Sequence, residues 1–428
     1  MIISMIQIIT LISSVIGILY LNKWVYAFIG FRYTRKFPET GNCHKYAVLI
    51  AARNEEAVIA DLIESIQCQD YPQELIDIFV VADNCTDHTA YIATQAGAIC
   101  YERSDANHKS KGYALQFLVE RIRRDYGIES YEGYFIFDAD NILKSDYIRR
   151  MNEAFDAGEK VVTSYRNTKI FSTNWISASY GIHWLRTCRM EHRGRSMLQL
   201  ACRVQGTGYL FASELIKDGW KHTCLTEDRA FCADAVERGY RIAYQNEAQF
   251  YDEQPDDLKT ALRQRLRWAK GNLIVTKLSS GKLLRRTVSG KSLKKRILCV
   301  DMLTIVYPRS MMLLIKKLII YLLRILIILF TVNSKSVWTP LWSLTALGLI
   351  ASVHTYLQRV VTAGYILFME RKRIEKLSLW QSIWYCLTFP AFDTIGKISC
   401  LVALFTRVEW KPIPHKVSTR TEQMQAGK

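Results

Sequence analysis

Two carboxylates follow an apolar run in the stretch Tyr134-Phe135-Ile136-Phe137-Asp138-Ala139-Asp140. Side chains alternate between the two faces of a β-strand, so we expect Asp138 and Asp140 on one face, at the end of a strand where a sheet meets solvent. Mg²⁺ and Mn²⁺ prefer oxygen ligands and keep further positions for water and substrate phosphates. The pair therefore indicates a metal site, although an isolated Asp-x-Asp is also typical of a plain turn.

Strands and helices alternate in the sequence before this pair. Residues 46–51 and 76–81 are predicted as strands, and residues 55–67 and 89–96 as helices, the second of them ended by Gly97. This order is typical of an α/β fold with a mostly parallel sheet, whose ligands bind at the carboxyl ends of the strands. Neither G-x-G-x-x-G nor a P-loop follows the first strand, which argues against a classical dinucleotide or P-loop site.

Two further polar segments, residues 51–55 and 82–87, fall at the ends of these predicted strands. Asp83 follows the second strand and is placed to accept hydrogen bonds from a base or ribose. Asp87 is suited instead to cap the helix that begins near Thr89. Lys111, which precedes Gly112, either brings positive charge to a diphosphate or is simply solvated.

Three motifs follow downstream, and each also has an ordinary structural explanation. They are Gln205-Gly206-Thr207-Gly208-Tyr209, Leu225-Thr226-Glu227-Asp228-Arg229 and Gln264-Arg265-Leu266-Arg267-Trp268. The glycines allow a backbone to approach a ligand closely, but they also suit a turn. The threonine and acids of the second motif suit a helix N-terminus. The third motif alone predicts a basic helix at a membrane interface.

The composition places these motifs in a membrane protein. The chain has 428 residues, 50% of them hydrophobic, and a formal net charge of +17. Residues 1–21 form an apolar run that we expect to be a retained membrane anchor. Basic residues lie beside apolar segments and form no aromatic-interleaved nucleic-acid motif, so we expect membrane lipids and no nucleic acid as partners. The eleven cysteines form no C-x-x-C pair and predict reduced thiols.

The last third of the sequence strengthens this expectation. Apolar runs cover residues 297–330, 337–368 and 379–405, interrupted by Pro308, Pro340 and Pro390. A basic segment before residue 297 and the sequence Arg371-Lys372-Arg373 predict cytoplasmic loops. The third run has basic residues on both sides, so the parity of the membrane helices stays open.

Taken in order, the motifs resemble those of the membrane-embedded, inverting family 2 glycosyltransferases with a GT-A fold, namely the processive synthases of the cellulose, hyaluronan and poly-N-acetylglucosamine type. The resemblance implies that Asp83 contacts uridine and that Lys111 lies near the nucleotide. Asp138 and Asp140 match the D-x-D motif, with Asp140 the more direct ligand of Mg²⁺ or Mn²⁺. Asp228, preceded by Glu227, matches the catalytic base.

The same resemblance assigns the remaining motif residues. Gln264, Arg267 and Trp268 match a Q-x-x-R-W motif that holds the diphosphate and borders the acceptor sugar. Gly206, Thr207 and Gly208 resemble a segment near the acceptor. The implied layout is a transmembrane anchor (1–22), a cytoplasmic linker (23–45), a GT-A catalytic domain (46–258), interfacial helices with a basic juxtamembrane segment (259–296), a membrane region (297–405) and a cytoplasmic tail (406–428).

The implied function is transfer of a sugar from a UDP-sugar to a growing β-linked exopolysaccharide by a multi-pass protein of the cell membrane whose catalytic domain is cytoplasmic. Transfer of one sugar to a membrane lipid is the alternative, and export or polymerisation partners are compatible with both. A transporter or receptor with a soluble domain is a remote third hypothesis. It predicts charged substrate sites inside the membrane, whereas few ionisable groups lie in the apolar runs.

Overall fold

A computed structural model describes residues 21–290, 292–307 and 338–409, together with positions 11, 319, 322 and 415. Its centre is a single sheet of eight strands in the order β3-β2-β1-β4-β7-β6-β8-β5. The strands are β1 Tyr46–Ala52, β2 Ile76–Asp83, β3 Ile99–Arg103, β4 Gly133–Asp138, β5 Ile142–Leu143, β6 Val161–Thr168, β7 Tyr209–Ala212 and β8 Ala243–Asp252. The α-helices are α2 Asn22–Arg32, α3 Ile59–Gln67, α4 Thr89–Gln95, α5 Lys111–Asp125, α6 Tyr147–Asp156, α7 Trp175–Thr187, α8 Arg193–Met197, α9 Glu227–Glu237, α10 Leu258–Ser289, α11 Leu293–Val306, α13 Trp338–Glu370 and α14 Leu379–Phe405.

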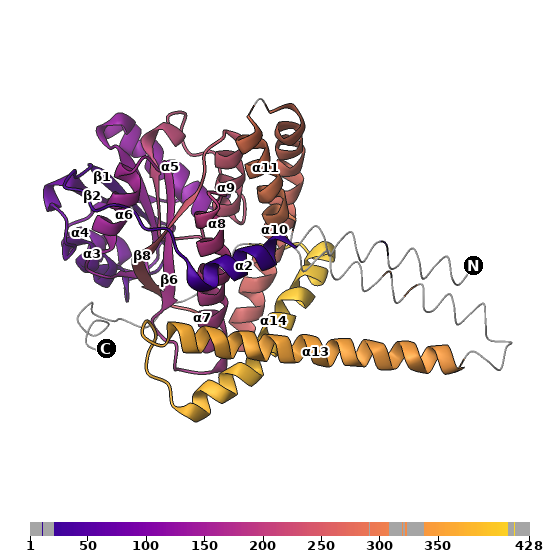
Figure 1. The fold of residues 1–428 in the computed structure, drawn as a ribbon. Coiled ribbons are helices and arrows are strands. Elements are labelled where there is room, and N and C mark those ends of the chain that lie inside the picture. Colours follow the sequence, from indigo (N-terminus) through magenta and orange to yellow (C-terminus); the bar gives the residue numbers. More distant parts are fainter. Residues whose placement is uncertain are drawn as a thin grey trace.

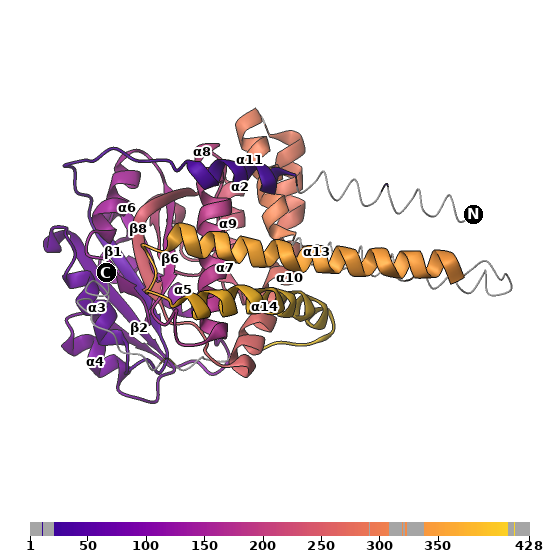
Figure 2. The same ribbon diagram turned by 60° about the horizontal axis from the view of Figure 1, so that its bottom comes forward.

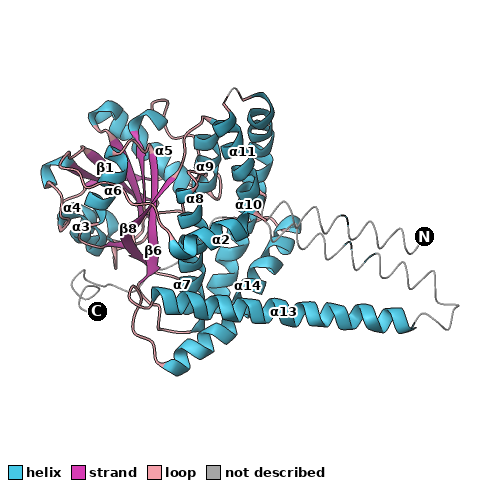
Figure 3. Ribbon diagram, viewed as in Figure 1, coloured by secondary structure: helices cyan, strands magenta, loops and turns pink. Residues whose placement is uncertain are grey.

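The sheet is parallel where the sequence predicts βαβ units. β1 pairs in parallel with β2 and β4, and β2 pairs in parallel with β3, so the carboxyl ends of these four strands share one edge. Strand β6 also pairs in parallel with β8, whereas β7 runs antiparallel to β4 and β6, and β5 antiparallel to β8. Helices cover both faces of the sheet (Figure 3). The sheet is thus mixed and mostly parallel, with helices on both faces, as predicted for an α/β fold.

Two local expectations need correction. Helix α3 begins at Ile59 rather than near residue 55, because residues 56–58 form a turn, and hydrogen bonds from the backbone N–H groups of Glu55 and Glu56 to Thr89 and Asp87 hold that turn against the next loop. Strand β4 ends at Asp138, so Asp140 lies in the following turn and not on the strand. Its carboxylate is oriented by a hydrogen bond from the backbone N–H of Glu253 (2.8 Å).

A second group of helices packs beside the sheet and extends away from it (Figure 1). Helix α10 packs against both α11 and α14, and α14 also packs against α7 and α13. Helix α13 projects furthest from the sheet in both ribbon views (Figures 1 and 2). Helix α14 has the predicted bounds and continues through Pro390, which therefore does not interrupt it.

The described helices support only part of the predicted membrane layout. Helix α14 is the one described helix that is long and apolar enough to cross a bilayer. Residues 1–10 and 12–20 of the predicted anchor, most of residues 308–337, and most of the tail after residue 409 lie outside the described part of the chain. The multi-pass arrangement therefore stays a prediction.

Asp301, an ionisable residue within an apolar run, has buried partners. Its carboxylate accepts a hydrogen bond from Tyr26 Oη (2.7 Å) and pairs with Arg195 Nη2 (3.2 Å). These contacts tie α2 and α8 to α11. Loss of Arg195 would leave the charge of Asp301 buried without compensation, so this pair holds α8 against α11. The hydrogen bond from Tyr26 holds α2 against the same helix.

Gly112, in the first turn of α5, allows the helix to approach another segment closely. A Cβ atom there would overlap the backbone carbonyl oxygen of His222. We expect Gly112→Ala to lower the free energy of unfolding by about 1–3 kcal/mol, because backbone cannot move aside as a flexible side chain does. Gly281→Ala, in α10, is the matched control. Nothing lies within 4 Å of its added Cβ, so this change is expected to stabilise by about 0.5–1 kcal/mol. Equal melting temperatures for the two variants in thermal denaturation would contradict the close approach.

Candidate active site

The carboxyl edge of the sheet forms one end of a cavity of about 440 Å³. Asp138 and Asp140 line it, as does Glu55 from the segment after β1. Burial raises the pKa of Glu55, and the charges of Asp140 and Asp138 add to this rise. Anionic oxygen atoms are thus crowded at this end, which we call the carboxylate end.

A lysine and the glycine segment hold Asp138. Lys111 is the first residue of α5, whose N-terminus is capped by the Ser110 hydroxyl. Its ammonium donates to Asp138 and to the carbonyl of Gly206 (2.8 Å). The backbone N–H of Asp138 donates to Thr207 Oγ1 (2.8 Å). The start of α5, the end of β4 and the glycine segment therefore meet at one point.

A histidine from the end of the chain enters the same region. His415 Nδ1 lies 2.9 Å from Glu55 Oε2, and its Nε2 lies 4.0 Å from Asp140 Oδ2. Burial alone would lower the pKa of His415, but the carboxylates of Asp140 and Glu55 raise it to about 10. The imidazole is therefore protonated at neutral pH and supplies positive charge to the carboxylate end.

The residues at this end fit a divalent cation, although no group of three or more His, Cys, Asp or Glu side chains among the described residues forms a compact metal site. Two carboxylates are sufficient for Mg²⁺, since the ion keeps waters and substrate phosphates among its ligands. The carboxylates of Glu55 and Asp140 attract the protonated imidazole of His415, and the same negative charge favours a metal cation. Asp138 and Asp140 are the candidate ligands.

The second motif begins α9 on another wall of the cavity. Glu227 is buried, and Asp228 lines the cavity next to it. Burial raises the pKa of Glu227 to about 7, with Lys111 opposing and Asp228 adding to the rise. Thr226 occupies the N-cap position without a side-chain cap hydrogen bond, because its side chain lies against Gly271 of α10. Glu227 and Asp228 are thus carboxyl groups with different environments.

The third motif lies on α10, which crosses the same cavity. Gln264, Arg267 and Trp268 all line it. Arg267 Nη1 donates to the carbonyl of Leu225 (3.4 Å), which joins α10 to the segment before α9. The Trp268 ring packs edge to face against Trp184 of α7, with ring centroids 5.6 Å apart. The basic helix predicted from sequence therefore forms a wall of the cavity.

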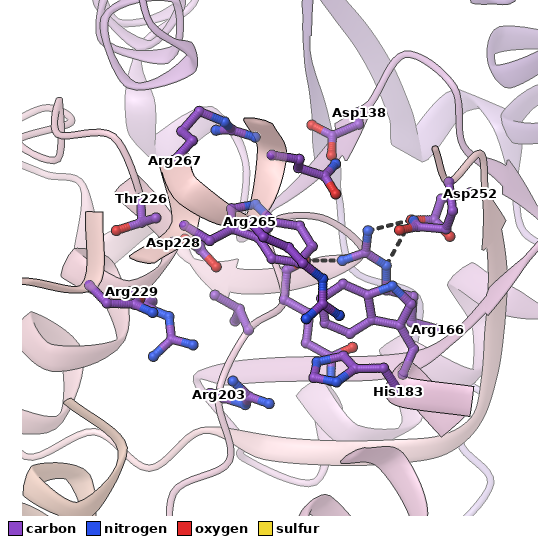
Figure 4. Close-up of a pocket in the computed structure, with 18 of the residues that line it drawn as sticks. Asp138, Arg166, His183, Arg203, Thr226, Asp228, Arg229, Asp252, Arg265 and Arg267 are labelled. Carbon is purple, nitrogen blue, oxygen red and sulfur yellow. Dashed lines mark hydrogen bonds and ion pairs between the residues drawn. The ribbon is translucent and has the colours of Figure 1, made fainter. Parts of the chain in front are cut away.

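A buried ion pair at the cavity wall joins two neighbouring strands of the sheet, Arg166 of β6 and Asp252 of β8 (Figure 4). Arg166 Nε lies 2.8 Å from Asp252 Oδ2, and its Nη1 donates to the carbonyl of Gln205. The guanidinium also lies 3.9 Å from the centre of the Trp184 ring. Burial raises the pKa of Asp252 to about 6, and Arg166 opposes this rise.

Most of the residues predicted from sequence meet in this one cavity. Its lining includes Lys111, Asp138, Asp140, Gly206, Glu227, Asp228, Gln264, Arg267 and Trp268. Thr207 and Gly208 lie behind the lining, where Gly208 has a φ of +64° and leaves no room for a Cβ beside Phe250.

Asp83 is the predicted residue that lies apart from this set. It does not belong to the lining, and its buried carboxylate pairs with Arg103. Burial raises the pKa of Asp83 and Arg103 opposes the rise. Its contact with uridine stays a prediction.

Sequence reasoning missed several lining residues, namely Arg166, Arg203, Arg229, Asp252 and His415. Arg229 directly follows Asp228, and its position in the motif was the one available signal. The others stand alone in strands, loops or the tail. Their proximity depends on the folding of distant segments, such as the contact between residues 55 and 415.

Comparisons with known proteins agree with the fold. The family model described as "Glycosyltransferase like family 2" matches residues 44–271. A probable glycosyltransferase, YdaM of Bacillus subtilis, is 23% identical over 249 residues, covering 54% of this chain and 56% of that protein. A poly-β-1,6-N-acetyl-D-glucosamine synthase of Staphylococcus epidermidis is 27% identical over 231 residues, covering 52% and 53%. The chain thus matches about half the length of these relatives.

One solved structure matches over nearly its full length. It is the mannosyltransferase PcManGT from Pyrobaculum calidifontis in complex with GDP-Man and Mn²⁺, with a TM-score of 0.59 and 15% identity. The match covers 93% of this chain and 99% of that one. At this identity the similarity demonstrates a shared fold.

The raised pKa of Glu227 predicts a pH-dependent stability. Between about pH 4.5 and 7 the folded protein keeps a proton on Glu227 that the unfolded chain releases, so this residue makes stability fall as pH rises through that window. In Glu227→Gln this contribution is absent. We expect the variant to gain about 1–3 kcal/mol relative to the unchanged protein between pH 5 and pH 8. Denaturation at both pH values checks this, and a stability difference that does not change with pH would contradict it.

Proposed function

The chain belongs to glycosyltransferase family 2, and from this premise we propose that it transfers a sugar from a UDP-sugar, with inversion, to an acceptor at a membrane surface. The observation that carries the proposal is the meeting of three separate motifs in one cavity. The carboxylates after β4, the acids that begin α9 and the Gln-x-x-Arg-Trp residues of α10 all line it. A transporter or receptor has no use for this arrangement.

Asp228 is the residue that we assign as general base. The acceptor hydroxyl forms a bond to the anomeric carbon while the bond from that carbon to the diphosphate oxygen breaks. The acceptor proton passes to the Asp228 carboxylate, and the bonding electrons leave with UDP. One displacement from the opposite face inverts the anomeric centre, so an α-linked donor gives a β-linked product.

Several residues supply the positive charge that stabilises the leaving diphosphate. Arg267 and Lys111 are placed to attract the departing diphosphate from α10 and α5. A divalent cation bound by Asp138 and Asp140 would neutralise further negative charge on that group. Trp268 and Trp184 form an aromatic wall suited to stack against a sugar ring.

Two products are compatible with this chemistry. A growing β-linked exopolysaccharide is supported by the similarity to poly-β-1,6-N-acetyl-D-glucosamine synthases. Transfer of one sugar to a membrane lipid is supported by the cavity itself, because Gly396, Lys397 and Cys400 of α14 form part of its wall. An acceptor that enters beside a bilayer-length apolar helix is in a suitable place for a lipid headgroup.

Replacing the assigned carboxylates tests the chemistry. We expect Asp228→Asn to reduce transfer at least about 100-fold, because the amide cannot accept the proton. Asp140→Asn is expected to reduce transfer and to weaken its dependence on Mg²⁺ or Mn²⁺. Asp218→Asn, at an exposed side chain away from the cavity, is the matched control. Initial rates should be measured on purified protein with melting temperatures checked. Full turnover by either cavity variant contradicts the role assigned to that residue.

The size of the product decides between the two acceptors. Membranes containing the protein are incubated with Mg²⁺ or Mn²⁺ and individual radiolabelled UDP-sugars. A long polymer that a glycosidase digests supports exopolysaccharide synthesis, whereas a discrete product extracted by organic solvent supports glycolipid synthesis. Absence of any labelled product with every donor, from protein that still melts cooperatively, would count against the transferase proposal.

A further inference from the structure

The end of the cavity away from the sheet is rich in arginine. Arg203 and Arg229 lie on the side opposite to Asp138 and Asp252 in Figure 4, with Asp228 nearby. We call this the arginine end. Charged residues that line it are Lys23, Arg186, Arg203, Arg229, Arg265 and Lys397 as cations, and Glu191, Asp228 and Asp393 as anions. Positive charge therefore exceeds negative charge there.

Some of this positive charge is already used in the fold. Asp393 of α14 pairs with Arg186 of α7 (3.6 Å) and with Lys397 of its own helix (3.9 Å). Arg265 donates to the carbonyl of Phe392 (3.2 Å) and lies over the Phe392 ring. These contacts fix α14 against α7 and α10.

Arg203 and Arg229 have no comparable anionic partner. Among the described residues, neither forms an ion pair with a carboxylate within 4.0 Å. Arg203 Nη2 donates only to Thr187 Oγ1, and Arg229 Nη1 only to the carbonyl of Ile305, each at 3.4 Å. A guanidinium carries five N–H donors, so most of the hydrogen-bonding capacity of both residues is unfilled.

Buried polar atoms around the two arginines also lack partners. Arg203 Nε, Asn272 Oδ1 and both amide atoms of Gln205 are buried without a hydrogen bond. Gln205 is only 6% exposed and lines the cavity. Buried polar groups normally have hydrogen-bond partners. Several unpartnered polar atoms in one place therefore point to a ligand that binds them.

The charges nearby do not compensate the arginines. Burial lowers the pKa of Arg229 to about 10, and Arg203 adds to this fall while Asp228 opposes it. Glu191 is held ionised, since Lys23 and Arg203 lower its pKa against the effect of burial. Glu191 and Asp228 are outnumbered by the cations that line this end, so an anion is the missing component.

The surroundings of the arginines are apolar on their far side. Arg203 and Arg229 also line a small recess walled by Val275, Met302, Ile305 and Val306 of α10 and α11. The arginine end is bordered by α14, the described helix able to cross a bilayer. The recess has a free volume of only about 10 Å³, too small for an alkyl chain, so α14 is the apolar surface beside the arginines. An anionic group attached to an apolar chain matches the arginines and α14, whereas a neutral sugar polymer matches neither.

We propose that Arg203 and Arg229 bind a phosphate group carried by a lipid acceptor. This inference rests on the proposed transferase function and identifies the chemical class of its acceptor. Planar guanidinium groups suit phosphate because they donate two parallel hydrogen bonds to its oxygens. The phosphate would hold the acceptor so that its sugar or hydroxyl reaches Asp228 from the membrane side. The donor diphosphate is assigned separately to the carboxylate end.

Binding of defined probes to the full chain in detergent tests this proposal. Quenching of Trp184 and Trp268 fluorescence reports on the cavity, which both residues line. The probes are farnesyl phosphate and farnesol, and dihexanoyl phosphatidylglycerol and dihexanoylglycerol, with inorganic phosphate as the free anion. We expect each phosphate-bearing lipid to bind at least about tenfold more tightly than its neutral counterpart. The tighter of the two indicates whether a polyprenyl phosphate or a glycerophospholipid is the source.

Matched variants assign the effect to the arginines. Arg203→Gln and Arg229→Gln should each weaken binding of the phosphate lipid about tenfold or more, and leave farnesol binding unchanged. Arg203→Lys keeps the charge and should restore most of the affinity. Arg263→Gln, at an exposed position of α10, is the control. Melting temperatures establish that each variant is folded. If Arg203→Gln does not fold, Arg203→Lys is compared with the unchanged protein instead.

Three outcomes would overturn the proposal. They are equal binding of farnesol and farnesyl phosphate, inorganic phosphate binding as tightly as the phosphate lipids, and competition by UDP that displaces the phosphate lipid from the arginines. Failure of the transferase proposal is distinguishable, because it appears as absent turnover of every UDP-sugar while arginine-dependent binding of the phosphate lipid persists.

Discussion

The buried ion pair between Arg166 and Asp252 holds together the surfaces on which the site depends. Arg166 belongs to β6 and Asp252 ends β8, and the same guanidinium contacts the carbonyl of Gln205 and the ring of Trp184. One side chain thus connects two strands, the glycine segment and α7. Loss of either partner would leave a charge buried without compensation, which typically costs about 3–5 kcal/mol. The pair therefore sets the spacing between the two ends of the cavity.

That spacing separates charges of opposite sign. Carboxylates gather where the parallel strands end, and arginines gather where α7, α9, α10 and α14 approach one another. We propose that two anionic substrates are held in this one cavity. Lys111 and a divalent cation would compensate the donor diphosphate at the carboxylate end, and the arginines would compensate the acceptor phosphate at the other. Asp228 lines the same cavity, as the general base that we propose for it requires.

Local sequence patterns predicted the parts of the fold that local forces determine. The strands β1 and β2 and the bounds of α14 were readable as continuous apolar runs, and α4 as a helix ended by Gly97. The start of α3 was not, because contacts with Asp87 and Thr89, which are distant in sequence, hold the residues before it in a turn. Motif order located the carboxylates and α10. Arg203 and His415 carry no local signal, since only tertiary packing brings them to the cavity.

The contact between Glu55 and His415 has a temporal consequence. The two residues are 360 positions apart, and a ribosome delivers the sheet long before it delivers α14 and the histidine. At that stage the nascent chain has the sheet with α7, α9 and α10, while α14 and His415 are still missing from the cavity wall. If the chain binds an activated sugar as we propose, water would have free access to it at that stage. Because α14 and His415 are synthesised last, the cavity is shielded from water only after the end of the chain has folded against the sheet.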